Sequence, residues 1–167
     1  MFVLGIDPGL SRCGFGAVTG PPGGERAVAA GVITTDRRLA LPARLAELRR
    51  EIDALVSEVR PDVVVVERVF FQTNAQTAMS VGQASGVALL VAAEHRCPVV
   101  EYTSNEVKQA VAGYGSAEKA QVQSMVARLL RLAELPKPPD VADALALALC
   151  HIAAQRSAAL ANAQAVR

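Results

Sequence analysis

The protein has 167 residues and a mass of 17.5 kDa, with 51% hydrophobic and 20% charged residues. This length suits one domain with a substantial core, and the apolar content excludes a disordered chain. The formal net charge of +1 argues against a purely electrostatic nucleic-acid binder, so any such role depends on where the charges lie.

The N-terminal segments predict three antiparallel strands. Residues 2–6 form a short apolar run that ends at Asp7-Pro8-Gly9, as expected of a buried strand followed by a turn. Residues 13–19 and 26–34 also have strand character, and a turn rich in glycine and proline separates them. This order favours a β-meander over a βαβ unit.

The next two elements have clear patterns. Apolar residues between 41 and 59 recur at spacings of three and four, which predicts an amphipathic helix that Pro61 stops. Four consecutive valines follow at 63–66 and end at Glu67. A run without alternation is typical of a central strand that is buried on both faces.

Two capping boxes mark later helices. Thr73 with Gln76 predicts a helix over about 74–95, and its many small residues would permit close packing. After a short strand at 98–102, Thr103 with Glu106 opens a second helix.

The C-terminal part predicts two more helices. Gly113 ends the preceding helix, and Ser116 is expected to cap a helix over 117–132. The last helix should run from about Asp140 to Arg156, and the alanine-rich tail 157–167 should be frayed or disordered. The elements predict a mixed α/β sheet in a single domain over residues 1–156.

Cysteine usage and the N-terminus predict a soluble cytoplasmic protein that does not associate with membranes. Cys13, Cys97 and Cys150 lie far apart, which indicates reduced thiols rather than disulfides or a zinc site. The first residues lack the basic region of a signal peptide. No unbroken apolar run approaches the roughly 18 residues that cross a bilayer.

Four acidic residues stand out by position. Asp7 and Glu67 end two predicted strands, and Asp140 and Asp143 share one face at the start of the last helix. Taken singly, Asp7 could be a turn residue and Asp140 a helix cap, but an acid that abuts a buried valine strand is harder to explain. Strand ends in an α/β sheet converge on one crevice, so the four carboxylates could meet there.

Carboxylates that lie so close repel one another unless a cation neutralises them. Mg²⁺ prefers oxygen ligands. Two such ions, roughly 3.5–4 Å apart, would clamp the attacking and leaving oxygens of a phosphodiester.

Four segments, in order and with matching spacing, resemble the RuvC family of bacterial Holliday-junction resolvases, which have a ribonuclease-H-like fold. They are Gly5–Gly9, Val66–Phe70, Gly113–Lys119 and Asp140–Ala146. The resemblance extends from residue 2 to about residue 152, and it implies a five-stranded mixed sheet flanked by helices.

The resemblance also implies an activity. Asp7, Glu67, Asp140 and Asp143 would be the catalytic metal ligands for Mg²⁺, two per subunit, with Mn²⁺ as a substitute. A homodimer would nick two strands of like polarity across a four-way DNA junction and leave 5′-phosphate and 3′-hydroxyl ends. Its partner would be the RuvA–RuvB branch-migration complex.

Three further residues would contact DNA by this resemblance. Phe70 would stack on an unpaired base near the crossover, and Lys108 and Lys119 would contact phosphates. The roles of Arg68, Phe71 and His151 stay open.

Other classes fit the sequence less well. Actin-like phosphotransferases share the early glycine-flanked aspartate but need two such domains. A non-catalytic junction-binding module would not need all four acids. A nuclease of the same fold that processes ribosomal RNA precursors would not account for Phe70 and the segment Gly115–Lys119.

Overall fold

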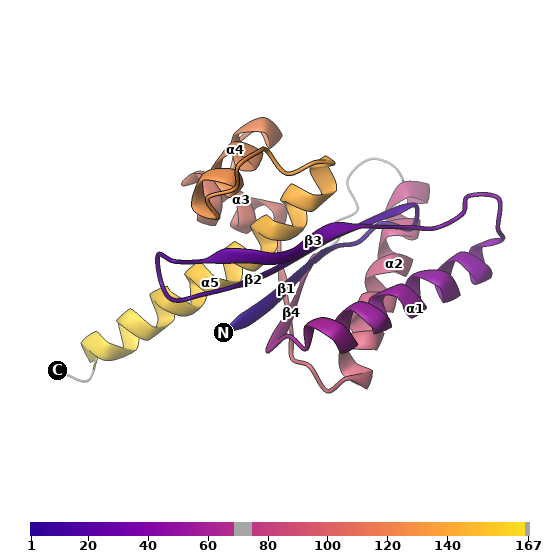
Figure 1. Ribbon diagram of the computed structural model, residues 1–167, viewed down its shortest axis with the longest axis horizontal. Coiled ribbons are helices and arrows are strands. Elements are labelled where there is room, and N and C mark those ends of the chain that lie inside the picture. The colour runs from indigo at the N-terminus through magenta and orange to yellow at the C-terminus, as the bar shows by residue number, and fades with distance from the viewer. Residues whose placement is uncertain (69–74, 166–167) are drawn as a thin grey trace.

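A computed structural model of the protein describes residues 1–68 and 75–165. Within these residues, five strands form one mixed sheet in the order β3-β2-β1-β4-β5 (Figure 1). The strands are β1 (Phe2–Asp7), β2 (Arg12–Thr19), β3 (Arg26–Thr34), β4 (Val63–Glu67) and β5 (Val99–Tyr102). The first three are antiparallel, and β4 and β5 continue the sheet parallel to β1, so the predicted meander and mixed sheet are confirmed.

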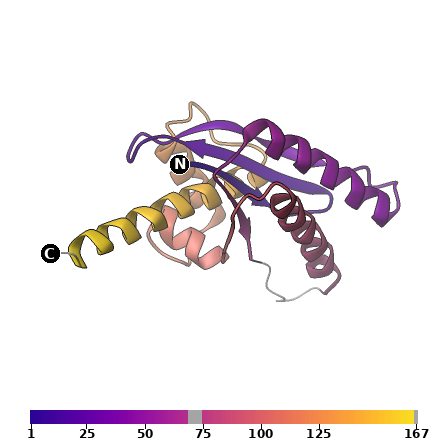
Figure 2. The same cartoon turned by 90° about the horizontal axis from the view of Figure 1, so that it is seen from below.

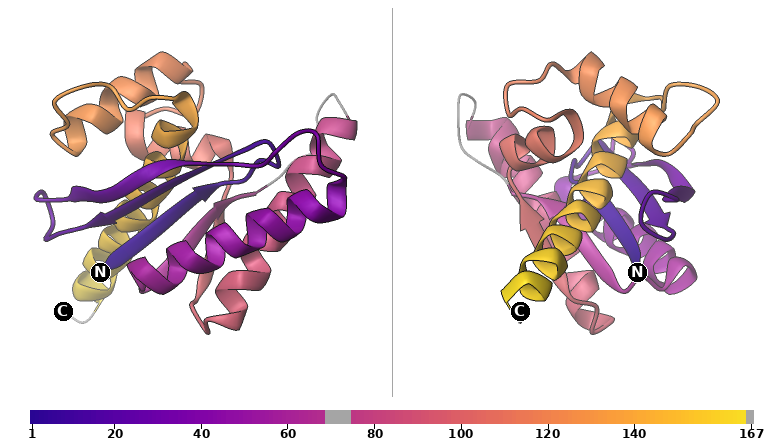
Figure 3. Two further views of the ribbon diagram at one scale, coloured as in Figure 1. Left: turned by 45° about the vertical axis from the view of Figure 1, so that its right-hand side comes forward. Right: turned by 90° about the vertical axis from the view of Figure 1, so that its left-hand side faces the viewer.

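Helices cover both faces of the sheet (Figures 1 and 3). On one face lie α1 (Leu41–Val59) and α2 (Ala75–Glu94), and on the other lie α3 (Ser104–Ala112), α4 (Lys119–Leu129) and α5 (Pro139–Ala165).

The valine run of β4 contributes to both layers. Val63 and Val65 pack on the side of α3, α4 and α5, whereas Val64 and Val66 pack on the side of α1 and α2. All four valines are buried. This two-sided burial explains why the strand shows no alternation of polar and apolar residues.

Helix α5 lies directly on β1 and β2 because glycines leave room for its backbone. A Cβ atom added at Gly5 would lie within 3.0 Å of the backbone oxygen of Ala144. A Cβ atom at Gly14 would meet the backbone of Asp140 at a similarly short distance. These approaches bring the first turns of α5 to the carboxyl end of β1, and Figure 3 shows the helix crossing the sheet there.

The capping box of α3 is confirmed. The Thr103 hydroxyl accepts a hydrogen bond from the Glu106 backbone N–H, and the Glu106 carboxylate accepts one from the Thr103 N–H. The helix ends at Gly113, whose φ of 89° lies in the left-handed region that favours glycine. The Thr73–Gln76 box predicted for α2 lies outside the described residues.

Helix α4 is shorter than predicted, and Ser116 does not cap it. It spans Lys119–Leu129 instead of 117–132, with Glu118 at the N-cap position and no side-chain cap. The backbone N–H of Ala117 donates to the carbonyl of Tyr114, and Ala117 is buried. Because this turn holds Ala117, the helix begins two residues later than predicted.

Helix α5 is longer than predicted. It continues to Ala165 rather than ending near Arg156, so the predicted end of the helix is wrong. Fraying of the exposed end stays a prediction. Alanine has the highest intrinsic helix propensity, and residues 157–165 contain no glycine or proline. Residues 157–164 are exposed, and this end of α5 projects beyond the sheet (Figures 1 and 2).

Length and composition alone would allow α5 to cross a membrane, because residues 139–164 are apolar enough on average. The first half of the helix is nevertheless buried against the sheet, with Leu145 and Leu147 in the core. Helix α5 is therefore the core helix of this fold. Cytoplasmic location stays a prediction.

We predict that Gly5→Ala strongly destabilises the protein. The added methyl group would clash with the backbone of α5, which cannot move aside as a flexible side chain could. Overpacking of this kind costs about 1–3 kcal/mol, or about 3–10 °C in melting temperature. The measurement is thermal unfolding followed by circular dichroism.

Gly115→Ala is the matched control, because its Cβ would make only ordinary contacts, the nearest at 3.6 Å. A Gly5→Ala protein that melts with the wild type would show that α5 does not pack as closely on β1 as described.

Candidate active site

The four acidic residues singled out in the sequence lie together at one edge of the sheet. Asp7 ends β1 and Glu67 ends the adjacent parallel strand β4. Asp140 and Asp143 lie in the first turns of α5. Asp7 experiences the negative charge of each of the other three, so the close packing of α5 on β1 creates an acidic cluster.

Asp7 is the most perturbed carboxyl group in this cluster. Burial, followed by the negative charges of its three acidic neighbours, raises its pKa from an ordinary 3.8 to about 7. The positive charge of Lys119 opposes this shift. Asp7 is therefore a partly buried acid whose negative charge the surrounding protein compensates only in part.

Glu67 shares this environment. Burial and the charge of Asp143 raise its pKa. Lys119, a hydrogen bond from the Ser104 hydroxyl and Lys108 act in the opposite direction. Ser104 is the first residue of α3, so the start of this helix fixes the Glu67 carboxylate.

Two of the four carboxylates are paired with cationic side chains. Arg12 Nη2 lies 2.5 Å from Asp140 Oδ2, and Lys119 Nζ lies 3.3 Å from Asp143 Oδ2. The charge of Asp143 and its hydrogen bond raise the pKa of Lys119, although burial opposes this. The protein thus neutralises part of its own acidic cluster.

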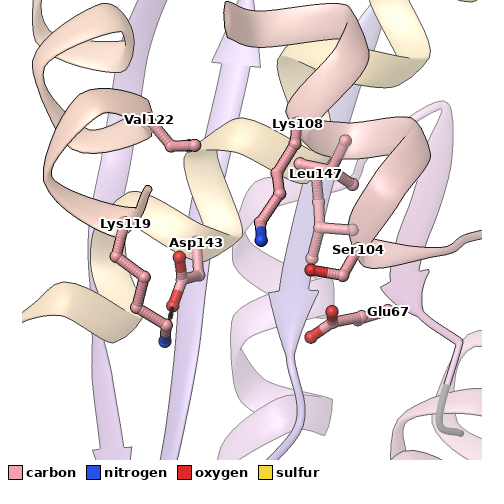
Figure 4. A pocket seen from close by; sticks show the side chains of 8 residues that line it. Glu67, Ser104, Lys108, Lys119, Val122, Asp143 and Leu147 are labelled. Carbon is pink, nitrogen blue, oxygen red and sulfur yellow. Dashed lines mark hydrogen bonds and ion pairs between the residues drawn. The ribbon is translucent and has the colours of Figure 1, made fainter. Parts of the chain in front are cut away.

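A pocket of about 100 Å³ opens beside these groups (Figure 4). Its polar lining consists of Glu67, Ser104, Lys108, Lys119 and Asp143. In Figure 4 the Lys108 amine points into the space between Asp143 and Glu67. Lys108 and Lys119, predicted as phosphate contacts, therefore lie next to the acids.

The donor chemistry of the cluster fits a hard divalent cation. All four groups are carboxylates. Burial, and then neighbouring negative charge, raise the pKa values of Asp7 and Glu67, and a bound cation would stabilise their charged forms. Among residues 1–68 and 75–165, however, no three Asp, Glu, His or Cys side chains converge closely enough to ligate one ion. The ligands fit Mg²⁺ in type and charge, while Arg12 and Lys119 hold two of them.

The aromatic predictions cannot be placed. Phe70 and Phe71 lie outside the described residues.

His151 is buried, and its Nδ1 lies 3.0 Å from the Tyr102 hydroxyl. It is therefore a core histidine with a hydrogen-bond partner, and burial lowers its pKa. The charge of Arg68 contributes to the lowered pKa of Glu106, which mainly reflects hydrogen bonds from Thr103.

The sequence did not predict the hydrogen bonds that hold the loop following Asp7. The Arg44 guanidinium donates to the Ser11 hydroxyl at 2.8 Å and to the Thr35 hydroxyl at 3.0 Å. Thr35 is buried and donates to the carbonyl of Leu10. These bonds attach the loop after β1 to α1. No local sequence pattern predicts them, because Ser11 and Leu10 lie 33 and 25 positions from their partners.

Comparisons with known proteins show the family to which the chain belongs. A family model described as crossover junction endodeoxyribonuclease RuvC matches residues 3–151. A crossover junction endodeoxyribonuclease RuvC from Salinispora arenicola is 57% identical over 153 residues, which cover 91% of this chain and 87% of that protein. One from Syntrophomonas wolfei is 46% identical over 167 residues, covering 100% and 97%.

A solved structure of T. thermophilus RuvC in complex with a Holliday junction substrate has the same fold. It superposes with a TM-score of 0.89 at 36% sequence identity, covering 95% of this chain and 96% of that one. The sheet with its five flanking helices, as described here, is therefore the resolvase form of the ribonuclease-H-like fold.

We predict that Asp7→Asn stabilises the metal-free protein above pH 7. The folded-state pKa of Asp7 is raised, so between about pH 4 and 7 the folded protein keeps a proton that the unfolded chain has lost. Stability therefore falls as pH rises through this window, and a neutral asparagine avoids the loss. The gain should be at most about 4 kcal/mol at pH 8, or up to roughly 8–16 °C, and should vanish near pH 4.

The measurement is melting temperature against pH in the presence of a chelator. Asp53→Asn, which removes an acid on α1 outside the cluster, should show no such gain. If Asp7→Asn is no more stable than the wild type at pH 8, then the negative charge of Asp7 does not destabilise the metal-free protein, and the prediction is wrong.

Proposed function

This chain belongs to the RuvC family of crossover junction endodeoxyribonucleases, and we propose that it resolves four-way DNA junctions by symmetric nicks in two strands of like polarity. It is a hydrolase of DNA recombination and repair. Each nick would leave a 5′-phosphate and a 3′-hydroxyl that ligase can rejoin. The observation that carries the proposal is the cluster of four carboxylates beside Lys108 and Lys119 at the carboxyl ends of β1 and β4.

We propose that Asp7, Glu67, Asp140 and Asp143 hold the metal, with two Mg²⁺ ions per subunit and Mn²⁺ as a substitute. Bound ions of this kind lower the pKa of water and stabilise charge on the attacking and leaving oxygens of a phosphodiester. Two ions would cancel the four negative charges, which leaves 17 basic against 12 acidic residues in the rest of the chain. The loaded enzyme would then present a modestly basic protein to DNA.

The protein groups around the acids orient the reacting parts. Ser104 holds the Glu67 carboxylate by a hydrogen bond, and the α5 backbone holds Asp140 and Asp143 in place. At neutral pH a carboxyl with a pKa of about 7 is partly protonated, so Asp7 must release its proton before it can act as a ligand.

Contacts to DNA would come from the cationic residues of the same pocket. Lys108 and Lys119 have flexible amines at the pocket wall, where a phosphate can approach from solvent. We propose them as phosphate contacts and Phe70 as the residue that stacks on an unpaired base.

We propose a homodimer that forms through α2. Its exposed side carries a stripe of apolar and small residues at spacings of three and four, namely Met79, Gly82, Gly86, Leu90 and Ala93. Met79 is 62% exposed and Leu90 is 52% exposed. A second copy of this face would bury the stripe, and the glycines would permit close approach of two backbones. Two active sites are what symmetric nicks require.

The RuvA–RuvB branch-migration complex is the proposed partner in the cell. This part of the proposal rests on the family alone.

The proposed activity is tested with a mobile synthetic four-way junction and Mg²⁺, with nicks mapped on all four arms. We expect paired, symmetric and ligatable nicks. Equal cutting of a plain duplex would overturn the proposal.

In the same assay Asp7→Asn should reduce cleavage by at least about 100-fold, because a metal ligand is lost. Junction binding should change by less than about threefold, since it depends on cationic and aromatic residues. Asp53→Asn, the same change on α1, should cleave as the wild type does. Normal nicking by Asp7→Asn would refute the ligand assignment.

For the dimer, Leu90→Glu places a charge in the apolar stripe of α2 and should convert the protein to monomer, measured by light scattering after gel filtration. Leu160→Glu is the matched control, because Leu160 is 66% exposed on the projecting end of α5. If Leu160→Glu dissociates the dimer and Leu90→Glu does not, the interface lies on α5 instead.

A further inference from the structure

We propose that Arg12 is a positioning residue that serves as an internal counter-ion for Asp140, and that a divalent cation must displace its guanidinium from this carboxylate in order to bind. The inference rests on the proposed role of Asp140 as a metal ligand. It goes further because it assigns a function to a residue outside the four acids and the two pocket lysines.

The contact is short and joins distant parts of the chain. Arg12 begins β2 and Asp140 lies in the first turn of α5, 128 positions away in sequence. The distance of 2.5 Å between Nη2 and Oδ2 is shorter than the roughly 2.7–2.9 Å usual for a charge-assisted hydrogen bond between nitrogen and a carboxylate. It is shorter than the 3.3 Å contact of Lys119 with Asp143, in which the lysine side chain is 80% exposed.

The backbone around Arg12 is held in place. Two residues along β2, Gly14 lies against the backbone of Asp140, so the strand and the helix cannot separate without breaking this close contact. On the other side, Ser11 accepts the hydrogen bond from Arg44. The backbone of Arg12 is therefore held on both sides, and from this position its guanidinium reaches Asp140.

The pair has a physical reason to exist before metal binds. Four carboxylates lie together at one edge of the sheet, and the negative charges of the other three repel that of Asp7. A guanidinium on Asp140 reduces that repulsion and keeps the carboxylate at the site.

The same guanidinium opposes metal binding. A cation that takes Asp140 Oδ2 as a ligand must compete with Arg12 for that oxygen, and it is repelled by the positive charge beside it. Removal of Arg12 should therefore tighten metal binding while it destabilises the metal-free protein.

The test is a titration of the full chain with Mn²⁺, in which free Mn²⁺ is followed by electron paramagnetic resonance. This readout does not depend on cleavage. Arg12→Gln should bind Mn²⁺ about 3- to 5-fold more tightly than wild type, the range expected for loss of a partly exposed ion pair. Its melting temperature in chelator should be lower than that of wild type. Arg12→Lys, which keeps the charge but loses the planar fork, should show a smaller gain in affinity and also carries the test if Arg12→Gln fails to fold.

Arg49→Gln is the matched control. Arg49 pairs with Glu94 at 2.7 Å, and its side chain is 45% exposed, against 44% for Arg12, but the pair joins α1 to α2 on the other face. It should leave Mn²⁺ affinity unchanged. Affinity of Arg12→Gln that is unchanged or weaker, or an equal gain in Arg49→Gln, would overturn the inference.

Asp140→Asn separates this inference from the proposed function. If Asp140→Asn binds Mn²⁺ and cleaves as the wild type does, the ligand assignment fails, and the role of Arg12 falls with it. If Asp140→Asn loses affinity but Arg12→Gln gains none, only the role of Arg12 is refuted.

Discussion

The close contact between α5 and the glycines of β1 and β2 is the constraint on which the site depends. No side chain separates the helix backbone from the sheet at Gly5 and Gly14, so the helix lies at the closest approach that two backbones allow. A larger residue would lift α5 off the sheet and carry Asp140 and Asp143 away from Asp7. The fold therefore uses backbone packing, rather than flexible side chains, to bring acids from two strands and one helix together.

That proximity creates an electrostatic cost which the chain offsets only in part. Arg12 pairs with Asp140, and Lys119 pairs with Asp143. Ser104 donates a hydrogen bond to Glu67, but Asp7 stays partly buried with a pKa near neutrality. A structure selected for stability alone would not place an acid there. This tension between stability and function is typical of sites where a ligand completes the charge balance.

Much of the fold follows from local patterns. Three patterns that span only a few residues each predict the element observed. They are the apolar stripe of α1, the valine run of β4 and the capping box of α3. Two predictions failed where local signals competed with context. Ser116 has the chemistry of a cap, yet the buried Ala117 turn delays α4, and the alanine-rich tail continues α5 without any core to support it.

The sequence by itself determined which acids stand at the ends of strands and at the start of a helix, because strand ends and helix starts are local features. It also carried four ordered segments that resemble one family. Only the tertiary structure decided which side chains oppose those acids. Arg12 and Asp140 are 128 positions apart, and no periodic pattern relates residues at such a separation. Ser104 contacts Glu67 only because α3 starts beside the end of β4. Such pairs depend on how elements pack, which no local pattern encodes.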